Sequence, residues 1–261
     1  MTTAETSQKR HLGIFAALVI PLYLTAWYAF RPVEPETSRI VESTGFVLWS
    51  LIAMLLFLTV ARQFAFLQSK PGTVMTSLCV GMLLWCAAES TWLYFTVIGV
   101  EPFPSVADLF WIAGYVPMLI GLGVNARGIP VKFKPLTLVV WLTASTAIVL
   151  LTSILEIVPI LYGGADVSTL ITVIYPAFDS LVISLVLVIL FKFKAGQVSR
   201  PWAAIAVGFI LNAVGDILFT YADWLGLYQG AYEPVDYLLA MGYAAFILGG
   251  LLFRRIYATE G

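Results

Sequence analysis

The chain has 261 residues, of which 61% are hydrophobic and 11% charged, and its formal net charge at pH 7 is −1. A soluble domain carries about 25% charged residues, so this composition excludes an ordinary soluble globular domain and favours a membrane protein. The net charge by itself says nothing about partners, because the charges are sorted by position along the chain. We therefore expect a lipid bilayer as the surroundings and no nucleic-acid partner.

Eight apolar stretches are long enough to cross a membrane, since a spanning helix needs about 20 mostly apolar residues. They lie near 12–30, 44–61, 74–99, 108–126, 135–159, 168–191, 201–225 and 235–253. The sequence predicts an all-α, polytopic protein of eight transmembrane helices, forming a single membrane domain (1–261) with tails at 1–11 and 255–261. The first stretch is followed by no small-residue cleavage pattern, so we predict no cleavable signal peptide.

The charges of the loops predict the orientation of these helices. All basic residues except Arg31 and Arg39 lie before the first span, after the eighth, or in the loops that follow the second, fourth and sixth spans. The intervening loops and helix ends are acidic. By the positive-inside rule, the basic segments are cytoplasmic. We therefore predict a multi-pass plasma-membrane protein with its N-terminus and C-terminus in the cytoplasm.

The chain also repeats itself. Residues 81–100 align with 208–227 at an offset of 127, which pairs Glu89 with Asp216. Residues 108–122 align with 236–250 at an offset of 128, which pairs Asp108 with Asp236. Because four spans separate equivalent positions, the two halves share one orientation, as in transporters with parallel repeats. The sequence thus predicts two parallel four-helix repeats, about 12–126 and 135–254.

Three spans carry a single central carboxyl group, namely Glu89, Asp179 and Asp216. Ionisable side chains within the hydrocarbon are costly, and by default they indicate a functional site. At helical spacing, Glu89 shares a face with tryptophans and Asp216 shares one with small and polar residues. Such faces suit either close helix contact or the lining of a cavity. Two interpretations stay open: acids that hydrogen-bond helix to helix, and a ligand, proton or substrate site open to the outer side.

Further candidates lie near the outer helix ends. Ser105-x-x-Asp108 is typical of a capping box, and Glu233-Pro234-x-Asp236 places an acid in the first turn of a helix. Capping is therefore the first interpretation for both aspartates, although both also border any outward cavity. A tyrosine follows each about two turns later, as a pocket or a packing residue. The candidate ligand-binding residues are Glu89, Asp179, Asp216, Trp85, Trp92, Asn212, Tyr115, Tyr243, Asp108 and Asp236.

Several chemistries are excluded. The single histidine, His11, lies at the cytoplasmic start of the first span, so we expect no histidine-ligated haem or metal in the membrane and no Ser-His-Asp triad. No lysine lies within a predicted span, which excludes a retinal Schiff base. Cys79 and Cys86 lie about 10 Å apart along one helix, too far for a disulfide. We expect free thiols, no metal and no cofactor.

Three segments resemble a class of bacterial and archaeal sensor proteins: PSVADLFWIAGY at 104–115, YPAFD at 175–179, and GDILF through GY at 215–243. In those proteins an eight-helix membrane input domain precedes a PAS, histidine kinase or diguanylate cyclase module. The resemblance covers most of the chain from the second span onward. It implies a ligand-binding sensor domain in signal transduction, with a cytoplasmic output domain or a homodimer as partner and no ligand specified. Whether an output module follows Gly261 stays open.

Two other functions are weighed against the sensor. Asn212 and Gly215-Asp216 partly match the N-x-x-G-D-x-x-L pattern, with Phe219 in place of the leucine, and resemble the lysoplasmalogenase family of membrane hydrolases. That resemblance implies that Glu89 and Asp216 act as general acid and base on a lipid ether. The third interpretation is a proton-coupled transporter with the carboxylates as relays. We rank the sensor first, so an enzymatic role is not the leading expectation.

Overall fold

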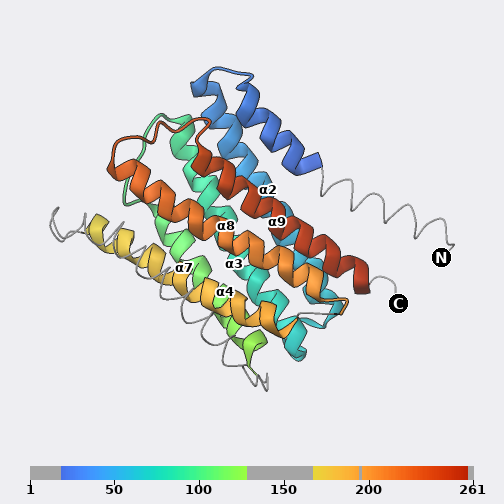
Figure 1. Ribbon diagram of the computed structural model, residues 1–261. Helices are drawn as coiled ribbons and strands as arrows, with labels where there is room; N and C mark the ends of the chain where they lie inside the picture. Colours follow the sequence, from blue (N-terminus) through green and yellow to red (C-terminus); the bar gives the residue numbers. More distant parts are fainter. Residues whose placement is uncertain (1–18, 128–166, 194–195, 258–261) are drawn as a thin grey trace.

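The computed structural model describes residues 19–127, 167–193 and 196–257 (Figure 1). Its helices are α2 (Pro35–Gln63), α3 (Lys70–Val97), α4 (Val106–Ala126), α7 (Val167–Lys192), α8 (Ser199–Trp224) and α9 (Pro234–Tyr257). A shorter apolar helix, Val19–Phe30, precedes α2. The 3-10 turn η1 (Phe66–Gln68) joins α2 to α3.

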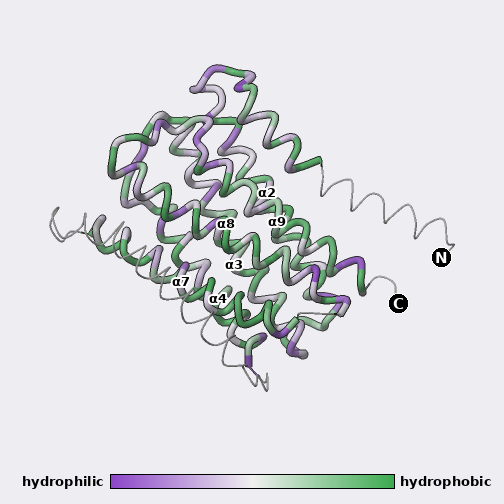
Figure 2. The backbone as a smooth tube through the Cα atoms, viewed as in Figure 1, coloured by the Kyte–Doolittle hydropathy of each residue, from purple (hydrophilic) through white to green (hydrophobic). Residues whose placement is uncertain are grey.

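Among the described residues, six helices are long and apolar enough to cross a membrane: α2, α3, α4, α7, α8 and α9. Large apolar side chains such as Leu48, Leu83 and Val207 face outward from them, and hydrophilic residues gather mostly toward the helix ends (Figure 2). The prediction of an all-α, multi-pass membrane protein is confirmed. The first predicted span, 12–30, is described only as the short helix Val19–Phe30, and the fifth, 135–159, lies outside the described residues. The count of eight stays a prediction.

Two helices, α2 and α4, begin with polar residues that stabilise their first turns. α2 begins at Pro35, well before the start predicted near residue 44, because a proline fits the first turn and the helix dipole favours Glu36 there. The prediction follows apolar residues alone, so it begins where the apolar run begins. α4 begins with the predicted capping box, in which the Asp108 carboxylate accepts the Ser105 N–H at 2.7 Å.

The long helices form a bundle in which α3 packs against α4, and α8 against α9. The remaining two helices connect these pairs: α2 packs on α3 and α9, and α7 packs on α8 and α4 (Figure 1). At the centre, the ring of Trp85 lies edge-on to Tyr115 and Tyr243, with centroid distances of 5.4 and 6.2 Å. This aromatic contact joins helices from both ends of the chain. Both cysteines, Cys79 and Cys86, are free.

Glycines let the paired helices approach closely. A Cβ atom at Gly114 on α4 would lie 3.1 Å from the carbonyl oxygen of Gly81 on α3. A Cβ atom at Gly242 on α9 would lie the same 3.1 Å from the carbonyl oxygen of Gly208 on α8. Small residues at such crossings bring helix backbones into contact, which stabilises helix packing in membranes.

Substitution of Gly114 tests this packing. In Gly114→Ala the new Cβ atom would lie 2.7 Å from the Trp85 indole nitrogen, so the tryptophan must move. We expect a loss of about 1–3 kcal/mol in the free energy of unfolding, as for other overpacked sites. Gly123→Ala on the same helix is the matched control, because a Cβ atom at Gly123 would meet no atom within 4 Å. Thermal unfolding in detergent micelles gives the comparison, and equal stability of the two variants would contradict the close approach.

Candidate functional site

A cavity of about 390 Å³ lies among the six long helices, where α2, α4, α7 and α9 begin and α3 and α8 end. This volume falls in the range of small-molecule sites. The polar lining is Arg39, Glu42, Ser43, Glu89, Thr96, Glu101, Asp108, Thr172, Asn212, Asp216, Thr220, Asp223 and Asp236. The aromatic lining is Phe46, Trp85, Trp92, Phe103, Trp111, Tyr115, Tyr175, Phe219, Tyr228 and Tyr243.

Two carboxyl groups lie deep in this cavity. Glu89 is eight residues before the end of α3, and Asp216 is eight residues before the end of α8. At about 1.5 Å per residue, both lie about 12 Å below the helix ends. Both side chains line the same cavity. The residues aligned by the repeat therefore face one common space.

The structure brings together all of the candidate ligand-binding residues except Asp179. Asp179 is buried on α7, with 2% of its surface exposed, and it reaches the cavity lining through a hydrogen bond from Tyr115. Four of the candidates that line the cavity are polar and buried: Glu89, Asp108, Asn212 and Asp236. The faces predicted from helical spacing on α3 and α8 are thus cavity faces.

Each deep acid receives a hydrogen bond from a distant tyrosine. The Tyr243 hydroxyl on α9 donates to Glu89 on α3 at 2.6 Å. The Tyr115 hydroxyl on α4 contacts Asp216 on α8 at 3.1 Å. Tyr243, on the last helix, thus bonds Glu89 on α3. Tyr115, on α4, bonds Asp216 on α8. These crossed bonds link the α3–α4 pair to the α8–α9 pair.

Tyr115 also contacts Asp179, at 2.6 Å. A tyrosine hydroxyl carries one proton to donate and lone pairs with which to accept. It can donate to only one of its two carboxyl neighbours, so the other must carry a proton and donate to the tyrosine oxygen. Asp179, Tyr115 and Asp216 therefore form a chain along which a proton is shared.

Aromatic side chains hold these tyrosines and Glu89 in place. The Trp111 indole donates to Glu89 at 3.2 Å, and the Trp85 indole donates to the Trp111 carbonyl at 3.0 Å. Phe178 stacks on Tyr115 with ring centroids 5.3 Å apart. The ring contacts thus fix the positions of the donors around Glu89 and Tyr115.

The outer acids are held in a similar way. The Tyr175 hydroxyl donates to Asp108 at 3.0 Å, in addition to the cap that Asp108 forms. The Tyr228 hydroxyl, in the loop before α9, donates to Asp236 at 3.2 Å. Burial, reinforced by the nearby Asp236, raises the pKa of Tyr228 well above its usual value, so this hydroxyl stays a donor. Asp236 also lies in the first turn of α9, as the sequence predicted.

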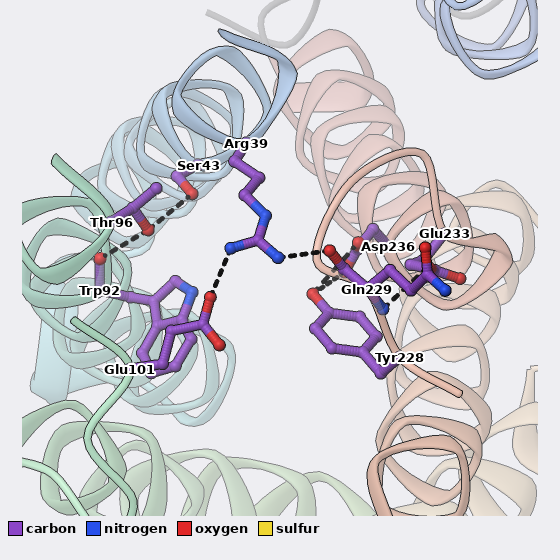
Figure 3. A network of polar contacts seen from close by, with 9 residues as sticks. All are labelled: Arg39, Ser43, Trp92, Thr96, Glu101, Tyr228, Gln229, Glu233 and Asp236. Atoms are coloured by element: carbon purple, nitrogen blue, oxygen red, sulfur yellow. Dashed lines mark hydrogen bonds and ion pairs between the residues drawn. The ribbon is translucent and has the colours of Figure 1, made fainter. Parts of the chain in front are cut away.

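Arg39 crosses the mouth of the cavity (Figure 3). Its guanidinium forms an ion pair with Glu101 at 2.6 Å and donates to the carbonyl of Gln229. It thereby connects the α3–α4 loop to the α8–α9 loop. The Arg39 and Glu101 side chains are 37% and 59% exposed, so their ion pair contributes only about 0.2–1 kcal/mol. The contacts of Arg39 that span the mouth of the cavity are therefore weak.

Sequence reasoning missed several lining residues, among them Arg39, Glu42, Trp111, Tyr175 and Tyr228. Arg39, Glu42 and Phe46 follow a helical period, so extending that period beyond the apolar run would have found them. Trp111 lies between two candidates, three residues after Asp108 and four before Tyr115. Tyr228 lies in a loop, where no periodicity marks it.

The functional groups of the site are carboxyl groups, hydroxyl donors and aromatic rings. In the described ranges, no group of three or more His, Cys, Asp or Glu side chains is arranged to hold a metal ion. The carboxyl groups can accept hydrogen bonds from a ligand or attract its positive charge. The chain formed by Asp179, Tyr115 and Asp216 can also move a proton between α7 and α8.

Comparison of the chain with protein-family models, with curated proteins and with solved structures finds no match.

Removal of the Tyr115 hydroxyl tests the crossed hydrogen bonds. Tyr115→Phe deletes a hydroxyl that hydrogen-bonds to two carboxyl groups, and we expect the protein to lose about 1–3 kcal/mol in the free energy of unfolding. Tyr94→Phe is the control, since Tyr94 is exposed on α3 and no hydrogen bond of its hydroxyl is seen among the described residues. Thermal unfolding of both variants in the same detergent decides the matter. A Tyr115→Phe protein as stable as the control would refute the bridging role.

Proposed function

We propose that this protein is a membrane-embedded sensory input domain that binds a ligand from the outer side, in the cavity between its two halves. The observation that carries the proposal is the placement of Glu89 and Asp216 at the bottom of one cavity. Buried acids that served only to join helices would have no need of an open space in front of them. Acids that receive a ligand need one.

We infer further that the two halves are parallel repeats. Gly81 and Gly114 meet as Gly208 and Gly242 do, at residues that the sequence alignment pairs. The ring of Phe178 packs on Tyr115, and that of Phe46 packs on Tyr243 at 6.0 Å. The tyrosine–acid bonds are exchanged between the halves in the same reciprocal manner. Such correspondences support an axis of pseudosymmetry through the cavity, as in other parallel-repeat membrane proteins.

The route from the cavity to the cytoplasm runs along α9. Tyr243, which donates to Glu89, lies eleven residues before Arg254, or about 16 Å along the helix axis. A ligand that engages Glu89 competes with the Tyr243 hydroxyl and so changes the contact between α3 and α9. A two-state shift of α9 would then be read by a cytoplasmic output domain beyond Arg255, which is the general logic of switches that act through packing.

A second candidate function is hydrolysis of a lipid ether. The proton shared along Asp179, Tyr115 and Asp216 favours it, because a hydrolase of this type needs a positioned general acid near its substrate. Glu89 on the opposite wall would act as the base. The sensor ranks above it because Tyr243 and Trp111 both donate to Glu89 Oε1, which makes this carboxyl group a weaker base.

Cysteine labelling tests the orientation of the cavity. Gln229 and Gln68 are both exposed but lie at opposite ends of the bundle, in the α8–α9 loop and in η1. In a background with Cys79 and Cys86 replaced by alanine, we expect a membrane-impermeant maleimide to label Gln229→Cys in intact cells and Gln68→Cys only after permeabilisation, since the basic helix ends are cytoplasmic. The reverse pattern would place the cavity on the cytoplasmic side and refute ligand entry from outside.

A ligand screen tests the function itself. We expect at least one small molecule to raise the unfolding temperature of the protein in micelles, and Glu89→Gln to weaken its binding about tenfold or more, because a hydrogen bond to a charged group is lost. Glu36→Gln on α2, away from the cavity lining, is the charge-matched control. The same ligand should change the mobility of a spin label at Arg254→Cys.

Three results would oppose the sensor proposal. Turnover of a lysolipid ether that Glu89→Gln and Asp216→Asn abolish would establish the hydrolase. Accumulation of a solute in proteoliposomes driven by a pH gradient would establish a transporter. Ligand binding that leaves the Arg254 label unchanged would remove the route through α9.

A further inference from the structure

The cavity is strongly unbalanced in charge. In the described part of the chain its lining has seven acidic side chains and one basic side chain, Arg39. Arg39 pairs with Glu101 at the mouth of the cavity (Figure 3). The deeper carboxyl groups are held by neutral donors, for example Tyr243 and Trp111 on Glu89. Neutral donors satisfy hydrogen bonds without adding positive charge, so each ionised carboxyl group of the lining attracts cations.

Two buried side chains still have oxygen atoms available to a ligand. Glu89 is 8% exposed and Asn212 is 5% exposed, and both line the cavity. Tyr243 and Trp111 both donate to the Oε1 atom of Glu89, and Asn212 uses its Nδ2 atom to donate to the Gly208 carbonyl. Among the described residues, Glu89 Oε2 and Asn212 Oδ1 receive no hydrogen bond from the protein. Both side chains line the cavity, so these two oxygens can accept a hydrogen bond from a donor within it.

Aromatic rings form the walls around these oxygens. Trp85, Trp92 and Trp111 all line the cavity, and the rings of Trp92 and Trp111 lie 6.0 Å apart, tilted by 51°. A ring face attracts a cation within about 6 Å of its centroid, and tryptophan does so most strongly. Aromatic walls with an acid at the bottom are suited to a cation that also has an apolar body.

We propose that the cavity binds an organic cation, an amine or a quaternary ammonium compound, with its charged group beside Glu89 and the indole rings of Trp85, Trp92 and Trp111. The inference rests on the proposed function, that this cavity receives a ligand. An amine donates hydrogen bonds to Glu89 Oε2 and Asn212 Oδ1, while a quaternary ammonium group contacts the rings alone.

An inorganic cation fits the site less well. Calcium takes six to eight oxygen ligands, and magnesium requires an octahedral set. The carboxyl oxygens here are shared with tyrosine and tryptophan donors, and no suitable group of three ligating side chains occurs among the described residues. Much of the wall is ring carbon, which cannot coordinate a metal. An organic cation uses both the charge and the apolar surface.

Arg39 shows that the outer part of the cavity already holds one cationic group. Its guanidinium is partly exposed and weakly paired, so an incoming cation can pass or displace it at low cost. Gly230 makes room for this side chain: its φ is +76°, and a Cβ atom there would lie 2.6 Å from the guanidinium carbon. The mouth is thus shaped around a planar cation.

Binding of matched probes tests the inference without any variant. Isothermal titration calorimetry is run on the full chain in maltoside micelles with protonated phenethylamine, tetramethylammonium, neutral 2-phenylethanol and anionic phenylacetate. We expect saturable binding of at least one cation, with 2-phenylethanol and phenylacetate weaker by about tenfold or more, because they lack the charge that the acids and rings attract. Equal binding of phenethylamine and 2-phenylethanol, or no binding of either cation, would overturn the inference.

Variants then locate the bound charge. Glu89→Gln should weaken cation binding about tenfold or more, and Trp92→Leu should weaken tetramethylammonium binding most, while Glu36→Gln should leave both unchanged. Residual binding of the neutral probe reports on folding in Glu89→Gln and Glu36→Gln, because neither substitution removes an aromatic ring from the cavity wall. Preference for the neutral or anionic probe would end the cation inference but leave the cavity as a ligand site. Absence of binding by every probe, with turnover of a lysolipid ether, would end both.

Discussion

A carboxyl group buried about 12 Å below the helix ends needs hydrogen-bond donors, and this need governs the arrangement of the helices. Glu89 finds its donor in Tyr243 of α9, and Asp216 finds its donor in Tyr115 of α4. Had each acid been satisfied within its own helix pair, the two pairs could separate without exposing an unmet polar group. Because the bonds are crossed, separation of the pairs takes Tyr115 from Asp216 and Tyr243 from Glu89, which then keeps only the Trp111 indole as a donor. The acids therefore lock the halves together while they define the cavity.

The crossing depends on a local device, the Gly-Tyr pair. Gly114 and Gly242 each lie against the neighbouring helix of their own pair, and the missing side chain brings the backbones close. The next residue on a helix points about 100° away, which directs Tyr115 and Tyr243 toward the opposite pair. One dipeptide thus sets both contacts: its glycine packs within a helix pair, and its tyrosine bonds between pairs. Small residues at membrane helix interfaces commonly have the first role, and the second follows from helical geometry.

The sequence was sufficient to predict the membrane class, most helix bounds, the capping box at Ser105 and the acids that share the cavity. Alignment within the chain paired Glu89 with Asp216, because intramembrane acids are rare enough to mark corresponding positions. It could not predict which tyrosine bonds which acid, since an alignment relates equivalent residues without saying whether contacts form within or between halves. Hydropathy alone starts the second span near residue 44 and leaves Arg39 outside it, although the helix begins at Pro35. Tyr228 reaches Asp236 from a loop, where no periodicity could indicate it.

The contacts at the bottom of the cavity are strong and buried, whereas those at its mouth are weak and partly exposed. At the bottom, buried carboxyl groups are held by tyrosine and tryptophan donors between rigid rings, so they change partners only at a considerable cost. At the mouth, Arg39 is held by a half-exposed ion pair and one carbonyl, contacts that water can replace. A ligand can therefore enter by disturbing the mouth alone, and it affects the packing of α3 and α9 only when it reaches Glu89. Entry and response are thus different events in this fold, because different residues resist them.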